Sequence, residues 1–418
     1  MYSLGKTRKI ACLLTELLPL FCAGLDCLAA SPEATPLSVF SADRDTLAAS
    51  KSAYESGDAK VKQVVSQLLK EADGRLDQKP PSVMEKNQIP PSGDKHDYIS
   101  QAPYFWRDTN SPDGKYVRRD GERNPESKQD SDAGRLGGVL SGIHTLGLAY
   151  YFTCDEKYAA KAAEIIRVFF LDPATRMNPN LNFGQGIPGE VDGRPTGLIG
   201  ARGFADFVDG VGLLANSKSL SRDEQNQMKA WARDYFHWLT TSKIGLGEDA
   251  ASNNHGTFYD VQAISLALYV GDTNYAHKKL LAAQQKRIAL EIEPDGKMPR
   301  ELARTLSFSY SLFNLRAEMN LADLGRVAGV NLWHYQTTDG RSLEKAIEFM
   351  APYANPDNKW PYKQIHKGSL SDLGDVLRRA AVEYPNSKVI ADALKYVNGG
   401  EENLSQLYTR TRLAANTN

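Results

Sequence analysis

One short segment of the sequence groups side chains that can transfer protons and bind an anion. Asn253, Asn254 and His255 are consecutive, and Tyr259 and Gln262 follow. If a helix begins near His255, then His255 and Tyr259 lie four residues apart on one face, with Gln262 one turn further on. A structural histidine in the core is the alternative. The two amides before His255 and the phenol after it favour a functional site.

A second polar segment spans residues 300–314. On a continuous helix, where each residue advances about 100° around the axis, its polar residues share one stripe. They are Arg300, Arg304, Ser307, Tyr310, Ser311 and Asn314. Leu302, Leu306 and Phe313 lie opposite. A solvent-exposed face is the alternative, although such faces usually carry Lys and Glu rather than Tyr.

These residue types suit β-elimination from a uronate. Removal of the C5 proton builds negative charge on the C6 carboxylate, and Arg and amide donors stabilise that charge as an oxyanion hole does. A neutral His or an ionised Tyr can take the C5 proton, and a phenol can protonate the leaving C4 oxygen. Hydrolysis would instead need two carboxylates across a cleft. Glu301 with Asp260 or Asp120 could supply them, so that alternative stays open.

Two segments without helical periodicity are candidates for substrate binding. Residues 94–129 are rich in Pro, Gly, Asp and Arg, and loops longer than about 12–15 residues usually bind or cover something. Their aromatic residues are Tyr98, Tyr104, Phe105, Trp106 and Tyr116. Beside Arg118, Arg119 and Asp120, such rings suit a cleft for acidic pyranoses. Residues 177–200 contribute Asn178, Asn180, Asn182 and Gln185. The alternatives are a loop that only packs its own aromatics and a solvated connector.

Helices are predicted to position these residues. Apolar residues recur at three- and four-residue intervals, whereas strand-like alternation is almost absent. The predicted helices are 61–72, 137–152, 158–170, 204–214, 222–239, 259–270, 275–292, 302–324 and 343–350. Helices joined by short loops predict a solenoid or a toroid of helical hairpins, and the lack of a fixed repeat disfavours the solenoid. We therefore expect an all-α fold, an (α/α) toroid or incomplete barrel, as a single domain over residues 31–418.

Residues 1–30 have the pattern of a secretory signal peptide. A positive n-region precedes the mostly apolar residues 10–25, and a small-residue run at 28–31 offers a cleavage site. A membrane anchor is the alternative, but Glu16 and Asp26 interrupt the apolar stretch, which falls short of the roughly 20 residues that a span needs.

The charge balance limits which binding partners are expected, and the cysteine content indicates the cellular compartment. The chain has 50 Lys and Arg against 51 Asp and Glu, whereas nucleic-acid binders usually carry a positive excess. Only Cys154 of the four cysteines lies beyond residue 30, which excludes an intramolecular disulfide and suits a periplasmic or secreted bacterial protein. We expect no nucleic acid and no integral membrane association, and the oligomeric state stays open. The seven histidines are scattered, so neither a metal nor another cofactor is expected, although an oxygen-ligated structural ion stays open.

The motif Asn253-Asn254-His255 resembles the Asn-Asn-His of the alginate lyase family whose helical toroid cleaves mannuronate-rich alginate. Arg304 and Tyr310 resemble the downstream Arg and Tyr of that family. Further segments resemble the broader alginate-lyase superfamily, namely residues 103–106, 118–121, 124–126, 180–185 and 360–364. Together the matching segments span roughly residues 95–365.

The resemblance implies an enzyme without a cofactor, a polysaccharide lyase that cleaves a (1→4)-linked anionic uronate polysaccharide by β-elimination. Alginate is the implied polymer, with preference for β-D-mannuronate and 4,5-unsaturated product ends. The family pattern implies Asn254 and Arg304 as carboxylate neutralisers, His255 as base or neutraliser, and Tyr310 as the phenol that protonates the leaving oxygen. In this chain Asn-Asn-His is followed by Gly-Thr-Phe-Tyr, so Tyr259 is the alternative catalytic phenol.

Two other functions remain open at this level. One is a glucuronan lyase, because glucuronate and mannuronate are alike at C4 and C5. The other is a non-catalytic periplasmic uronan-binding protein. The residues expected to bind substrate are Tyr104, Trp106, Arg118, Arg119, Asn182, Gln185, Asn253, Tyr259 and Arg300.

Overall fold

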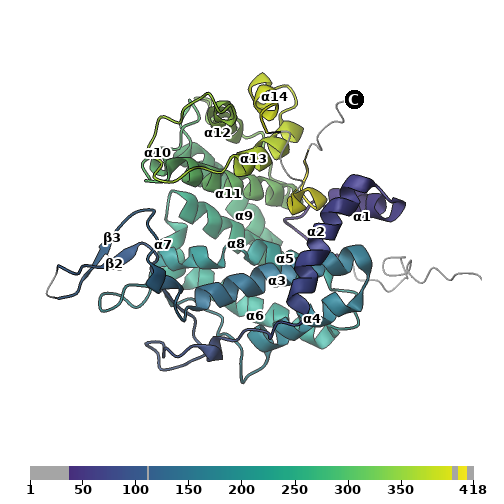
Figure 1. Ribbon diagram of the computed structural model, residues 1–418, viewed down its shortest axis with the longest axis vertical. Helices are drawn as coiled ribbons and strands as arrows, with labels where there is room; N and C mark the ends of the chain where they lie inside the picture. The colour runs from purple at the N-terminus through teal and green to yellow at the C-terminus, as the bar shows by residue number, and fades with distance from the viewer. Residues whose placement is uncertain (1–36, 111–112, 398–402, 412–418) are drawn as a thin grey trace, which may run out of the picture. The chain divides into compact units, whose positions relative to one another are not determined.

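The computed structural model describes residues 37–110, 113–397 and 403–411, and helices dominate these ranges (Figure 1). Residues 35–418 form one compact unit. The helices are α1 Arg44–Ser56, α2 Ala59–Leu76, α3 Asp132–Thr153, α4 Glu156–Ile166, α5 Phe204–Leu213, α6 Arg222–Thr241, α7 Lys243–Asp249, α8 Asn254–Val270, α9 Thr273–Ala283, α10 Pro299–Leu302, α11 Ser307–Ala328, α12 Leu343–Met350, α13 Leu370–Glu383 and α14 Lys388–Leu394. The strands are β1 Ile99–Gln101, β2 Phe105–Arg107, β3 Tyr116–Arg118 and β4 Phe183–Gly186. The predicted all-α class is confirmed. The predicted signal peptide lies outside the described residues.

Local sequence signals fix several helix ends. Ser221 and Glu224 form a capping box at the start of α6, in which each side chain accepts from the other's backbone N–H. Gly271 ends α8 in the left-handed conformation at φ 95°, which glycine adopts without steric cost. Among the described residues, none of the helices combines the length and the hydropathy needed to cross a membrane.

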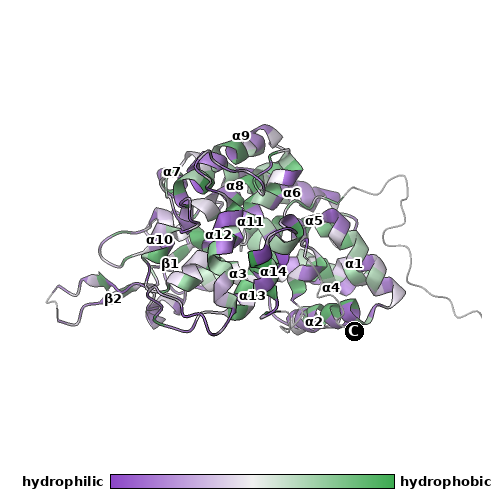
Figure 2. Ribbon diagram, turned by 90° about the horizontal axis from the view of Figure 1, so that it is seen from above, coloured by the Kyte–Doolittle hydropathy of each residue, from purple (hydrophilic) through white to green (hydrophobic). Residues whose placement is uncertain are grey.

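The core is built around α8. This helix packs against α5, α6, α9 and α11, and nearly all of its residues from Asn254 to Tyr269 are buried. Helices α3 and α5 also pack on each other, and their approach is close because a Cβ on Gly147 would lie 2.5 Å from the carbonyl oxygen of Gly210. The outer helices, such as α1 and α9, carry both hydrophobic and hydrophilic residues, whereas the segment with β2 is mainly hydrophilic (Figure 2).

The predicted continuous helix over residues 302–324 is wrong. The chain forms α10, breaks at residues 303–306 and starts again as α11. In the break, the backbone N–H of Thr305 donates to Asp120 at 3.0 Å, and its carbonyl accepts from Ile365 at 3.0 Å. Long-range partners therefore replace the helical hydrogen bonds. The predicted polar stripe is also wrong, because Ser307, Ser311 and Asn314 face the core and are fully buried.

The two segments predicted as loops are joined by a short sheet. Strand β1 pairs in parallel with β4, which brings residues 94–129 against residues 177–200. Strands β2 and β3 form an antiparallel hairpin, which extends away from the helices (Figure 1). A Cβ on Gly193 would lie 1.9 Å from the carbonyl oxygen of Asn182. The second segment therefore folds back on itself so closely that only glycine fits at position 193. The first segment also reaches the start of α11, because the Tyr104 hydroxyl is 2.6 Å from that of Tyr310.

Candidate active site

Tyr310 is the centre of the candidate site. It lies in the first turn of α11, its hydroxyl is 2.6 Å from the hydroxyl of Tyr104, and either oxygen can donate. The guanidinium carbon of Arg304 lies 3.6 Å from the Tyr310 ring centroid. Burial raises the pKa of Tyr310 above its ordinary value, and the positive charge of Arg304 opposes that shift. The phenol is therefore protonated at neutral pH, and the adjacent cation stabilises a phenolate when the proton leaves.

Asp120 holds Arg304 in place. The Nε of Arg304 donates to Asp120 Oδ1 at 3.0 Å, and Nη2 donates to the same oxygen at 2.7 Å. Burial favours the neutral form of Asp120, but hydrogen bonds from Arg304 and Thr305 outweigh it and hold the Asp120 pKa well below its usual range. Nη1 of Arg304 makes no hydrogen bond to any described residue, so it is available to a substrate carboxylate.

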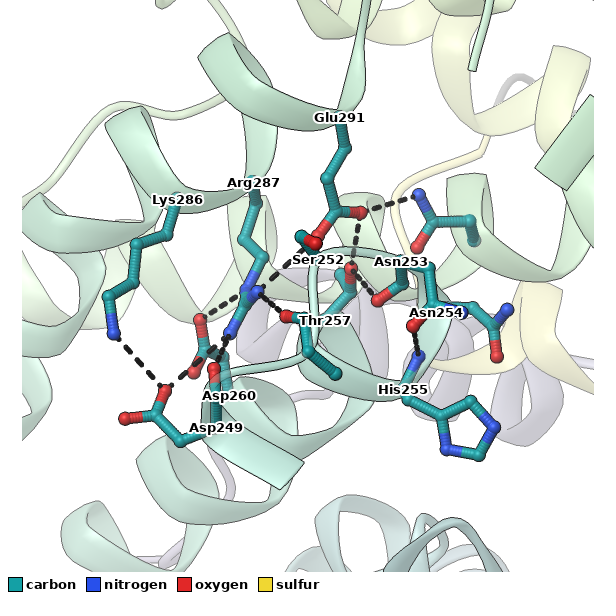
Figure 3. A network of polar contacts seen from close by, with 12 residues as sticks. Asp249, Ser252, Asn253, Asn254, His255, Thr257, Asp260, Lys286, Arg287 and Glu291 are labelled. Carbon is teal, nitrogen blue, oxygen red and sulfur yellow. Dashed lines mark hydrogen bonds and ion pairs between the residues drawn. The ribbon is translucent and has the colours of Figure 1, made fainter. Parts of the chain in front are cut away.

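The start of α8 presents His255. The side chain of Asn253 caps the helix and accepts from the backbone N–H of His255 at 3.3 Å. Nδ1 of His255 lies 2.6 Å from the buried carboxylate of Glu248, on α7. Figure 3 shows the imidazole directed away from the charged network on the other side of the helix. In the tautomer whose Nδ1–H donates to Glu248, the lone pair of the imidazole lies on Nε2, which can accept a proton there.

Glu301 anchors Asn254. Nδ2 of Asn254 donates to both carboxylate oxygens of Glu301 at 2.8 Å, and the backbone N–H of Asn254 donates at 2.7 Å. Both side chains are 1% exposed. Burial raises the pKa of Glu301. The hydrogen bonds from Asn254 and the nearby charges of Arg304 and His255 lower it, but by less than burial raises it. Asn254 thus ties α8 to α10 with its amide hydrogens engaged, and its role toward a substrate stays a prediction.

The carboxylates that hydrolysis would require are engaged elsewhere. Asp120 is ionised and bound to Arg304, and Glu301 is bound to Asn254. Asp260 lies in the core, 1% exposed at the side chain, where Arg287 Nε donates to it at 2.8 Å. No two of these three groups offer the free acid and free base of a glycosidase. The geometry therefore favours elimination.

Two half-buried rings of the aromatic segment, those of Trp106 and Tyr104, each lie against an arginine of the same segment. The guanidinium carbon of Arg119 is 5.1 Å from the Trp106 ring centroid. Arg123 lies over Tyr104 at 5.8 Å. Arg118 lies at the exposed end of β3, where it also pairs with Asp120 at 2.8 Å. The segment therefore brings aromatic rings and positive charge together, and its role in substrate binding stays a prediction.

Two amide residues predicted to bind substrate, Asn182 and Gln185, form hydrogen bonds to side chains of the protein. Oδ1 of Asn182 accepts from the indole N–H of Trp238 at 2.9 Å. Gln185, at φ 48°, accepts from Arg194 through its carbonyl oxygen at 2.9 Å and through Oε1 at 3.1 Å. The guanidinium of Arg194 lies 4.8 Å from the ring centroid of Phe105. Gln185 therefore positions a cation that sequence reasoning missed.

The prediction that Tyr259 binds substrate is wrong. Tyr259 is 1% exposed, and its hydroxyl donates to the carbonyl of Leu239 on α6 at 3.1 Å. Gln262 is also buried, and it donates to the carbonyl of Leu198 at 3.2 Å. Other helices pack around α8 on all sides, so residues one turn or more after His255 on the same face of α8 are buried in the core. Arg300 is exposed on α10, and it donates to the carbonyl of Ser252 at 2.7 Å, so it supports the loop before α8.

Glu248 is expected to act as a positioning residue for His255. The Glu248→Gln variant should lower kcat about tenfold or more, because the amide keeps a hydrogen bond to Nδ1 but removes the charge that fixes the imidazole. KM and the thermal midpoint should change little. Steady-state kinetics with a thermal melt checks this, and an unchanged kcat would show that Glu248 has only a packing role.

Within the described ranges, no group of three or more His, Cys, Asp or Glu side chains is placed to hold a metal ion. Glu248, Glu301, Arg123 and Arg194 were missed as site residues. Arg123 lies inside the aromatic segment and could have been chosen for that reason. Glu248 and Glu301 join the site through contacts across separate helices, which leave no local sequence signal.

Comparison with known proteins shows which family the chain resembles. The family model described as Alginate lyase matches residues 82–360, which is more than half of the sequence. No curated protein matches the chain. The crystal structure of an alginate lyase from Bacteroides ovatus is 38% identical, has a TM-score of 0.84, and covers 88% of this chain and 97% of its own.

More distant structures share the fold. An alginate lyase variant complexed with a tetrasaccharide is 15% identical, with a TM-score of 0.57 and coverage of 92% of this chain and 97% of its own. An alginate lyase from a Sphingomonas species is also 15% identical, with a TM-score of 0.51 and coverage of 85% and 93%. The predicted helical toroid is confirmed by these similarities. The chain belongs to the alginate lyase family.

Proposed function

We propose that this protein is a polysaccharide lyase that cleaves the (1→4) linkages of alginate by β-elimination, with a preference for β-D-mannuronate. The observation that carries the proposal is the Tyr310 phenol, which lies on Arg304 and is hydrogen-bonded to Tyr104. Membership of the alginate lyase family supports the polymer and the reaction type. The pattern of residues 1–30 supports a periplasmic or secreted location.

In the proposed reaction, the substrate carboxylate binds to the free nitrogen of Arg304. This contact strengthens as charge moves onto the carboxylate, so it stabilises the enediolate more than the ground state. Two groups can take the C5 proton, namely Nε2 of His255 and Tyr310 after ionisation. The electrons of the C5–H bond form the C4–C5 double bond while the C4–O bond breaks, and Tyr310 gives its proton to the leaving oxygen.

The preference for mannuronate rests on contacts away from the reacting atoms. Mannuronate and glucuronate are alike at C4 and C5 and differ at C2, so Tyr310 and Arg304 would treat both in the same way. Discrimination must come from residues that contact the C2 hydroxyl. The intact phenol and imidazole favour an enzyme over a non-catalytic uronan-binding protein.

A substrate screen tests the proposal. The purified protein is mixed with polymannuronate, polyguluronate and glucuronan, and the ultraviolet absorbance of the new conjugated double bond is followed. The fastest rise is expected with polymannuronate. A faster rise with glucuronan would support a glucuronan lyase instead, and no rise with all three polymers would overturn the proposal.

A further inference from the structure

Two arginines beside the rings around Tyr310 have no carboxylate within ion-pair distance among the described residues. Among the described residues, Arg123 and Arg202 form no ion pair with a carboxylate, although both are exposed. Arg304 and Arg118, by contrast, share Asp120. Charged side chains without partners beside a catalytic group are candidates for binding a charged ligand.

Arg202 lies against Phe313, which is one helical turn along α11 from Tyr310. Its guanidinium carbon is 5.6 Å from the ring centroid of Phe313, and Nη1 donates to the carbonyl of Ile199 at 3.1 Å. Phe313 follows Tyr310 by three residues, so the two side chains are neighbours about 60° apart around α11 and about 4.5 Å apart along its axis. Phe313 is itself held by Phe258, at a centroid distance of 4.3 Å.

Arg123 reaches the same area from a different segment. It lies over Tyr104, whose hydroxyl is bonded to Tyr310. Burial, and then the positive charges of Arg123 and Arg316, lower the pKa of Arg202, and the negative charge of Asp206 opposes the shift. The positive charges of Arg123 and Arg316 thus disfavour the charge on Arg202. Arg316 has a partner, Asp372, at 3.2 Å, whereas an anion bound beside Arg202 and Arg123 would remove their repulsion.

We propose that Arg202 and Arg123 form a second carboxylate subsite, which binds the uronate residue adjacent to the one that reacts at Tyr310. The inference rests on the proposed function, because each residue of a uronate chain brings one carboxylate. A guanidinium group binds a carboxylate through two parallel hydrogen bonds, and the rings of Phe313 and Tyr104 support the guanidinium groups of Arg202 and Arg123. The subsite selects a chain that is acidic at two successive residues over one that is neutral at the second.

Oligomannuronates of increasing length test the subsite. The wild-type kcat/KM should rise steeply at the length that first fills the subsite. Arg202→Gln should remove that step, lowering kcat/KM on longer oligomers about 10–100-fold through KM, because one charge-assisted interaction is lost. The shortest cleaved oligomer should be barely affected. Arg123→Gln should act in the same direction.

The matched control is Arg233→Gln, which removes an exposed arginine on α6 and should leave every oligomer unchanged. A loss of the same factor at all lengths, or no loss beyond that of the control, would overturn the subsite. Thermal melts identify a folding defect. In that event Arg202→Lys, which keeps the charge but not the planar fork, decides the matter, because the inference requires it to recover part of the step.

A binding measurement separates this inference from the proposed function. Calorimetric titration of saturated trimannuronate into the wild-type protein and into Arg202→Gln needs no turnover. The variant should bind about tenfold or more weakly, and the difference should shrink at high salt. Equal affinities would overturn the subsite. An absence of elimination with every polyuronate, together with weaker binding by the variant, would overturn the lyase but leave the subsite standing.

Discussion

The Tyr310→Phe variant is expected to lose about 10²–10⁴-fold in kcat, because it removes the O–H that protonates the leaving oxygen. The ring remains, so its contact with Arg304 at 3.6 Å and the local fold are kept. KM should change less than kcat. Initial rates of double-bond formation on polymannuronate, measured for both proteins at one pH, check the prediction.

Tyr259→Phe is the matched control. It removes a buried hydroxyl that donates to the carbonyl of Leu239, so it should cost about 1 kcal/mol of stability and leave the rate near wild type. If Tyr310→Phe kept a near-normal rate while Tyr259→Phe lost it, the assignment of the catalytic phenol would be wrong.

The Arg287→Met variant is expected to lower the free energy of unfolding by about 3–5 kcal/mol, because it leaves buried carboxylates without their counter-charge. Arg287 is 1% exposed and donates to Asp260 at 2.8 Å and to Glu291 at 3.3 Å (Figure 3). It also donates to the carbonyl of Ala251 at 2.6 Å, in the loop before α8. The variant should therefore also lose activity, since this loop leads to His255.

The destabilisation should depend on pH. Burial raises the pKa of Glu291 and of Glu318 above their ordinary values, and the charge of Arg287 opposes both shifts. Without Arg287 these acids hold their protons more strongly in the folded state than in the unfolded state. Stability then falls as pH rises above the unfolded-state pKa. The difference between variant and wild type should be larger at neutral pH than in mild acid.

Lys286→Met is the control for Arg287→Met. Lys286 is exposed, and its ammonium group lies 3.5 Å from Asp249, so its removal should cost no more than about 1 kcal/mol. Urea unfolding of the three proteins at two pH values gives both comparisons. A loss for Arg287→Met no larger than that for Lys286→Met would show that the network does not hold the core.

Most helices could be predicted because their apolar residues recur at helical intervals and their ends carry capping residues. Helices α1, α7, α13 and α14 were not predicted, and the break between α10 and α11 is the most instructive difference. The periodicity of residues 302–324 is regular, but Asp120 and the chain near Ile365 take the backbone hydrogen bonds of Thr305. Such partners are distant in sequence, so spacing alone could not reveal the break. Because α11 begins anew after this break, Ser311 and Asn314 lie in the core and not on a polar surface.

The candidate site could be predicted where chemistry is carried by residue type. His255 follows two amides, and Arg304 and Tyr310 lie in a polar segment without Lys. These residue types suggested a functional site in the sequence. Glu248 and Glu301 hold His255 and Asn254 from α7 and α10, and only the packing of these helices brings them there. Tyr259 was misplaced because helical spacing gives the angle around α8 but not what surrounds the helix at each turn.

The chemistry of bond cleavage is the most direct test of the central claim. Polymannuronate is digested with the wild-type protein in water enriched in heavy oxygen, and the products are analysed by mass spectrometry. When the digestion is short and the new aldehyde ends are reduced at once to stop their oxygen exchange with water, elimination predicts an unsaturated end and no heavy oxygen in either product. The glycosidic oxygen stays with the leaving saccharide and no water is added. Incorporation of heavy oxygen into saturated products would show hydrolysis and contradict the account.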